Sequence, residues 1–269
     1  MEDTAARFDS ARTAATLREV ARASAGLVVL DPGLPDAVMD GWPVPVPEEI
    51  RVLLRSVAGV RITVSRSALN GHESVEHVDL AHPYNVADAG AGWYLDHAGG
   101  AGTHWFVHTD TGDGHDYVDV DPATGSWGAV FRFWDATDTV RLAPSLPVWL
   151  DALTGCLRGA LEETVAGTAV PSGPEGAAAV RAFGNRFAEA WAALDEHPTD
   201  VGTVTAAQAG AGPDPLLREA AAGLPADALL ADLRPVHGPA RVVFDHPVSC
   251  RYARHAGGAV LIATAWDGE

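Results

Sequence analysis

Residues 92–135 constrain the fold most strongly, because they have the pattern of four short strands joined by turns. Apolar and polar side chains alternate over residues 104–110 and again over residues 117–121, which is the period of half-buried strands. Turn-forming residues occupy positions 111–114 and 121–125 between them. Connections this short join antiparallel neighbours, so the stretch predicts a β-meander and not βαβ units.

Sequence motifs before and after this stretch fall in a recognisable order. The segment "VFRFWD" ends the meander, "SLPVWLDAL" follows it at residues 145–153, and "PVPVPEEIRVLLRSVAGV" precedes it at residues 43–60. The set of motifs over residues 43–161 resembles the SUKH superfamily. That group includes fungal cell-wall-assembly regulators and many bacterial toxin-immunity proteins.

The resemblance implies a fold and a class of function. The implied fold is α+β, with a mostly antiparallel sheet flanked by helices. The implied function is a non-enzymatic protein-binding module, and in bacteria most often an immunity protein that neutralises a toxin by direct binding. The resemblance implies no catalytic residue, metal or cofactor, and its partner is a protein.

Helix and strand patterns outside the meander complete the expected fold. We predict helices at residues 4–25, 47–58, 145–165, 176–194, 214–222 and 225–233. We predict strands at residues 27–30, 60–64, 75–80, 139–142, 241–245 and 259–265, the strand at 139–142 lying at a sheet edge, with a loop at residues 31–47. The Gly- and Pro-rich segment 167–176 predicts a linker between a SUKH-like domain (1–166) and a small C-terminal α+β extension (177–269).

Acidic residues dominate the charge of the chain. The 36 acidic residues outnumber the 18 basic ones, all of which are Arg, and no Arg lies between Arg66 and Arg132 while ten carboxylates do. Such a field repels nucleic acid and anionic lipid and attracts basic partners. Together with the resemblance, which implies a toxin, it makes a basic toxin the expected partner. General solubility is the alternative explanation.

Aromatic side chains are concentrated in the same meander as the carboxylates. Because strand side chains alternate between faces, these rings cannot all point to one core. An exposed aromatic patch rimmed by carboxylates would suit protein binding, whereas helices on both faces would bury it. The partner-binding residues predicted from this pattern are Asp113, Asp116, Asp119, Asp121, Trp127 and Trp134.

Seven histidines in the acidic region support a second hypothesis, a metal-dependent hydrolase or sensor. They are His72, His77, His82, His97, His104, His108 and His115. His104 and His108 would share a strand face, but no metalloenzyme motif accompanies them. A third hypothesis is a regulatory scaffold of cell-envelope assembly, which differs from an immunity protein only in its partner.

The remaining features indicate the compartment. Cys156 and Cys250 are too few and too far apart for a disulfide framework. The N-terminus lacks a signal-peptide pattern, and no apolar run approaches the length that spans a bilayer. The sequence therefore predicts a cytoplasmic protein that does not bind a membrane.

Overall fold

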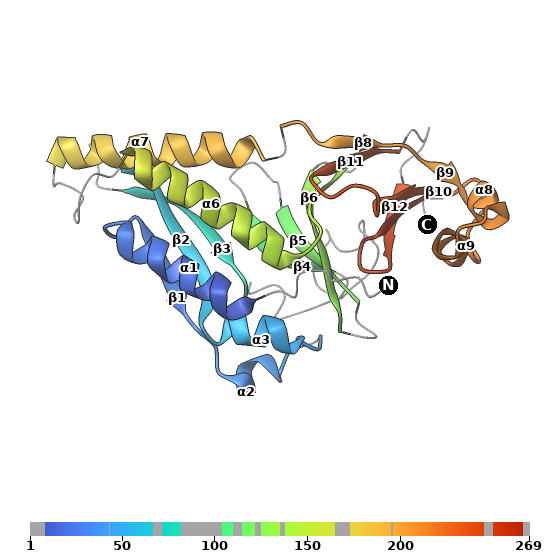
Figure 1. The fold of residues 1–269 in the computed structure, drawn as a ribbon, viewed down its shortest axis with the longest axis horizontal. Helices are drawn as coiled ribbons and strands as arrows, with labels where there is room; N and C mark the ends of the chain where they lie inside the picture. The colour runs from blue at the N-terminus through green and yellow to red at the C-terminus, as the bar shows by residue number, and fades with distance from the viewer. Residues whose placement is uncertain are drawn as a thin grey trace. The chain divides into compact units, whose positions relative to one another are not determined.

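The structure of the chain is a computed structural model that describes residues 9–42, 44–66, 72–81, 104–109, 115–121, 125–134, 138–164, 173–194, 196–244 and 250–265. These residues form an α+β fold with a nine-stranded, mostly antiparallel sheet, a second sheet of four strands and seven described helices (Figure 1). The predicted fold class is confirmed.

Residue contacts divide the chain into two compact units. Unit 1 comprises Met1–Gly41, Val46–Ala81 and Pro147–Leu194, and unit 2 comprises Trp42–Pro45, His82–Leu146 and Asp195–Glu269. Residues 177–194 group with unit 1 in these contacts, because the helix that they form packs on a strand of that unit. The domain boundary at residues 167–176 stays a prediction from sequence.

Three antiparallel strands and five helices make up unit 1. The strands are β1 (Val28–Pro32), β2 (Val57–Arg66) and β3 (Glu73–Asp79), paired in that order. The helices are α1 (Ser10–Ala23), α2 (Asp36–Met39), α3 (Glu48–Leu54), α6 (Leu146–Thr164) and α7 (Gly173–Ala192). All were predicted from periodicity except α2, a single turn within the predicted loop.

Two local features explain where the first helices of unit 1 begin. The Asp9 carboxylate accepts a hydrogen bond from the Arg12 amide and caps α1. Pro47 precedes α3, and Glu48 and Glu49 in its first turn complement the helix dipole.

Helix α7 approaches β2 at backbone distance. A Cβ added at Gly184 would lie 2.0 Å from the carbonyl oxygen of Val64, so no side chain fits there. Phe183 and Phe187 on the same helix are buried, and Trp191 stacks on Phe187. Trp149 of α6 meets Trp191 edge to face, which ties the two helices together.

The predicted meander is the centre of unit 2. Strands β4 (His104–Thr109), β5 (His115–Val120), β6 (Trp127–Trp134) and β7 (Asp138–Ala143) pair antiparallel in sequence order. The first of the four strands predicted within residues 92–135, before residue 98, lies outside the described residues. The edge position predicted for 139–142 is wrong, because β7 also pairs with β11 (Ala240–Val243), which pairs in parallel with β8 (Thr199–Val201).

The second sheet of unit 2 is built from C-terminal residues. Its order is β12 (Cys250–His255), β13 (Val260–Ala265), β10 (Leu229–Asp232) and β9 (Val204–Thr205), with α8 (Ala206–Ala211) and α9 (Pro215–Ala221) packed against it. The helix predicted at residues 225–233 is wrong, since this segment contains β10.

Strand β10 was mistaken for a helix because both of its faces are buried. Leu230 packs with α8 and α9, whereas Ala231 packs with Tyr117 and Phe131 of the meander. A strand covered on both sides has a continuous apolar run, which periodicity does not distinguish from a buried helix.

Candidate functional site

Asp116 lies at the centre of a charged row that crosses three strands of the meander. Its carboxylate accepts hydrogen bonds from Arg132 Nε (2.9 Å) and Nη2 (3.3 Å). His108 Nδ1 lies 3.4 Å from Asp116 Oδ2. Only 1% of Asp116 is exposed. The pairing of His108 with Asp116 and of Asp116 with Arg132 in the strand register fixes this arrangement.

The partners of Asp116 determine its ionisation. Burial acts to raise the pKa of Asp116, but the hydrogen bond from His108 and the charge of Arg132 outweigh it, so the pKa is lowered from its ordinary value. Asp116 is therefore an ionised carboxylate inside the protein.

We expect Asp116→Asn to change how stability depends on pH. A lowered folded-state pKa contributes stability that is present above the unfolded pKa, about 4, and is lost as the pH falls through the folded value. The variant should be less stable than the wild type at neutral pH, with the gap narrowing below about pH 4. Urea unfolding across a pH series measures this. Asp227→Asn, at an exposed position, is the control. A difference in unfolding free energy between wild type and Asp116→Asn that stays constant with pH would contradict the lowered pKa of Asp116.

Asp119 forms a second internal ion pair on the opposite face of β5. Arg254 Nε donates to Asp119 Oδ1 at 2.7 Å, and the two side chains are 3% and 9% exposed. Arg254 also donates to the hydroxyl of Tyr117 and lies 5.2 Å from the centre of its ring. Burial raises the pKa of Asp119, Arg254 lowers it and Asp121 raises it again, with a net upward shift.

The six predicted partner-binding residues therefore have different positions. Asp116 and Asp119 are internal, which contradicts their expected exposure: both faces of β5 are covered in this region and each carboxylate is bonded to an arginine. Asp113 and the side chain of Trp134 lie outside what the structure describes. Asp121 and Trp127 are partly exposed.

Trp127 is the outer ring of an aromatic ladder at the β5–β6 hairpin. Its centroid lies 5.2 Å from that of Trp105, which lies 4.6 Å from that of the buried Trp42. The indole Nε1 of Trp127 donates to the carbonyl of Pro45 at 3.3 Å. The ladder holds the partly exposed ring in one orientation.

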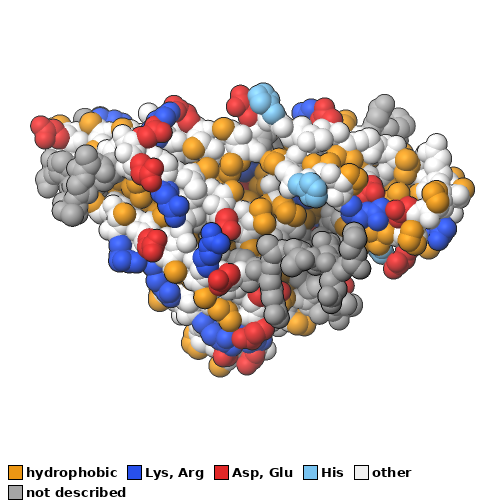
Figure 2. Space-filling model, in the orientation of Figure 1, with side chains coloured by type: hydrophobic (Ala, Val, Ile, Leu, Met, Phe, Trp, Pro, Cys, Tyr) orange, Lys and Arg blue, Asp and Glu red, His pale blue; other side chains and the backbone are white. Residues whose placement is uncertain are grey.

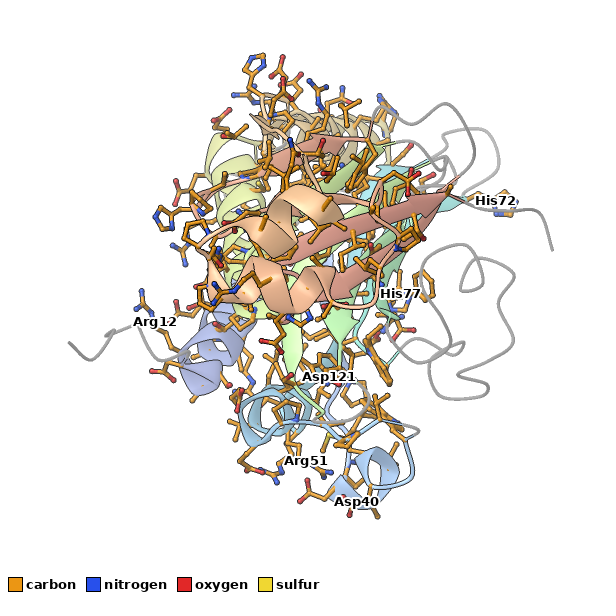
Figure 3. The ribbon with its side chains drawn as sticks, turned by 90° about the vertical axis from the view of Figure 1, so that its right-hand side faces the viewer. Arg12, Asp40, Arg51, His72, His77 and Asp121 are labelled. Carbon is orange, nitrogen blue, oxygen red and sulfur yellow. The ribbon has the colours of Figure 1, made fainter. Side chains whose placement is uncertain are left out.

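The histidines are dispersed where the structure describes them. His108 is buried beside Asp116, and His77 Nε2 lies 2.9 Å from Asp31 Oδ2 in unit 1. Figure 3 shows His72, which precedes β3, well separated from His77 in β3. Across the described ranges, no three His, Cys, Asp or Glu side chains come together in a way that could hold a metal ion. His82 and His97 lie outside those ranges.

A β-bulge also separates the two histidine positions expected to share a strand face. The register pairs residue 104 with residue 119 but residue 108 with residue 116, and it shifts between Phe106 and His108. Residues 116 and 119 are an odd number of positions apart, so the backbone positions 104 and 108 belong to opposite faces of the ladder.

Internal arginine pairing was the feature of unit 2 that sequence reasoning missed. Unit 2 contains 19 acidic residues and 7 Arg, a net charge of −12. Beyond the two buried pairs, Arg234 binds Asp214 and Asp232, and Arg241 binds Asp200. Arg141 is buried and donates to the carbonyls of Leu233, Val236 and Gly238. These arginines are held by intramolecular partners, and the remaining carboxylates dominate the field of the unit.

Comparison with known proteins gave no match among protein-family models, curated proteins or solved structures. The SUKH resemblance thus stays a prediction from sequence motifs. Of the helices that the structure describes, none combines the length and apolar character needed to cross a bilayer.

Proposed function

We propose that this chain is a protein-binding module that acts on a basic partner by direct association. The observation that carries the proposal is the net charge of −12 in unit 2, whose described arginines bind to carboxylates and carbonyls of the same chain. A field of this sign accelerates encounter with a basic surface.

The partly exposed residues of the β5–β6 hairpin are the proposed contacts in unit 2. Trp127 is held by Pro45 and Trp105, so little side-chain entropy is lost when a partner covers it. Asp121 lies across the same hairpin, its amide donating to the Ser126 carbonyl. An anchored indole and a carboxylate on one hairpin suit a partner surface that offers both apolar groups and cations.

The most specific form of the proposal is an immunity protein that neutralises a toxin. This form is supported by the SUKH resemblance, and it accounts for the acidity, because a nuclease toxin presents a basic cleft for phosphates that an acidic protein can occupy. A regulatory scaffold would use the same surface on a different partner.

The test is binding to the purified product of the neighbouring reading frame, followed by surface plasmon resonance. We expect the association rate constant to fall by about tenfold or more between about 0.05 M and 0.5 M salt, because salt screens long-range attraction. Sucrose in place of salt is the control for viscosity. If the product is a toxin, co-expression should restore growth. Failure to bind, or an association rate indifferent to salt, would contradict the proposal.

A further inference from the structure

Unit 1 has a sheet whose two faces differ in what covers them. One face of β1–β3 carries Val28, Val60, Ile62 and Val78, all buried. Helices α1 and α7 pack on these strands, and α6 is tied to α1 by the hydrogen bond from Thr13 to Asp151. Figure 3 shows Arg12 of α1 and His77 of β3 on opposite sides of unit 1. The helices therefore lie on the side away from His77.

The other face carries side chains that remain accessible, and we call it the open face. Its residues follow from the register, which aligns Val29 with Arg61 and Arg61 with His77. The described side chains of the open face are those of Val29, Asp31, Arg61, Thr63, Glu73, Val75, His77 and Asp79, of which Thr63 alone is buried. Val29 and Val75 are 41% and 45% exposed, so two apolar side chains flank a charged centre.

The charged centre of the open face has a fixed geometry. Asp31 binds Arg61 Nε through Oδ1 (2.8 Å) and His77 Nε2 through Oδ2 (2.9 Å). Gly59 lies beneath them, and a Cβ there would be 2.7 Å from Asp31 Oδ2 and 3.2 Å from His77 Nε2. The absence of a side chain at Gly59 leaves space for the side chains of Asp31, Arg61 and His77. A preorganised surface of this kind loses little entropy when it is covered.

Among its described side chains, the open face carries three carboxylates (Asp31, Glu73 and Asp79) and one guanidinium (Arg61), so acidic groups are in excess there as they are in the whole chain. Asp31 is shared by Arg61 and His77, and Asp79 adds a further carboxylate whose Oδ1 accepts the Ala81 amide. On the helix-covered side, acidic and arginine side chains are also interspersed (Figure 2). Many of them pair there, as Arg51 does with Asp40 and Arg55 with Asp36.

We propose that the open face of β1–β3 is a docking surface for the basic protein partner. The two valines meet apolar groups of that partner, and the carboxylates meet its cations. The inference rests on the proposed function, which supplies a basic protein as the occupant, and it adds the surface of unit 1 that this protein covers. Apolar side chains within a charged setting, held on a rigid sheet, are the composition of a protein-binding patch.

Two matched substitutions test this assignment. Val75 on the open face is 45% exposed and Val148 on α6 is 47% exposed, so Val75→Lys and Val148→Lys make the same change at equal accessibility. With the purified product of the neighbouring reading frame, we expect Val75→Lys to weaken binding by about tenfold or more, through lost apolar contact and charge repulsion. Val148→Lys should stay within about twofold of the wild type.

The outcomes separate the inference from the proposed function. Circular dichroism melts establish that each variant is folded, and Val29→Lys on β1 is the substitute test if Val75→Lys unfolds. If the wild type binds and neither Val75→Lys nor Val29→Lys lowers the affinity more than Val148→Lys does, the open face is not the docking surface. The proposed function is then unaffected. If the wild type does not bind, the proposed function fails and the inference fails with it.

Discussion

Arg254→Leu will destabilise the protein by about 3–5 kcal/mol, because it leaves the carboxylate of Asp119 buried without its cation. The pair joins β5 to β12, and neither side chain has more than 9% exposure. The substitution also removes the hydrogen bond to the Tyr117 hydroxyl and the contact with its ring. Equilibrium unfolding in urea at neutral pH, followed by tryptophan fluorescence, measures the loss.

Two further variants separate the burial of charge from the loss of volume. The double variant Asp119→Leu, Arg254→Leu should recover a large part of the loss, since no charge is then left unpaired. Arg241→Leu removes a surface pair with Asp200 and should change stability by less than about 1 kcal/mol. A double variant no more stable than Arg254→Leu alone would show that the buried charge is not the cause.

Gly184→Ala will destabilise unit 1 by about 3 kcal/mol, although alanine is the better helix former. The new Cβ would lie 2.0 Å from the Val64 carbonyl oxygen and 2.7 Å from its carbon. These are backbone atoms of β2, so the strand or the whole helix α7 must move. Thermal and urea unfolding measure the effect.

The control for Gly184 is a helical glycine with open space around it. Gly155 in α6 would place its Cβ more than 4 Å from any other group, and it is exposed. Gly155→Ala should therefore stabilise the protein by about 0.5–1 kcal/mol through helix propensity alone. The two substitutions are chemically identical and should have opposite signs. Equal stabilisation by both would mean that α7 does not approach β2 closely.

Local patterns predicted the elements whose neighbours lie close in sequence. The alternation around Tyr117 and the turns beside it predicted the meander, and Pro47 with Glu48 and Glu49 predicted the start of α3. Short-range periodicity and turn chemistry determine these elements. Long-range pairing was inaccessible: β7 gained a neighbour in β11, nearly a hundred residues later, and became an interior strand.

The candidate site was predicted less well, because a buried carboxylate on a strand has the same sequence pattern as a solvated one. The sequence pattern predicts that Asp119 points to solvent. In the structure it pairs with Arg254 of β12, a strand that was not predicted. Asp116 meets Arg132 across a hairpin, and that pair could have been found by testing antiparallel registers for opposite charges. Sequence predicted β3 as a strand, but not which of its faces the helices leave open.

Hydrogen–deuterium exchange on the chain with and without its partner tests the central claim, that a basic protein docks on this fold. Our account predicts slower exchange in β3 (Glu73–Asp79), in β2 (Val57–Arg66) and at the start of β6 around Trp127 when the partner is present, with α6 (Leu146–Thr164) unchanged. Slower exchange confined to α6, or no change anywhere in the chain, would contradict it.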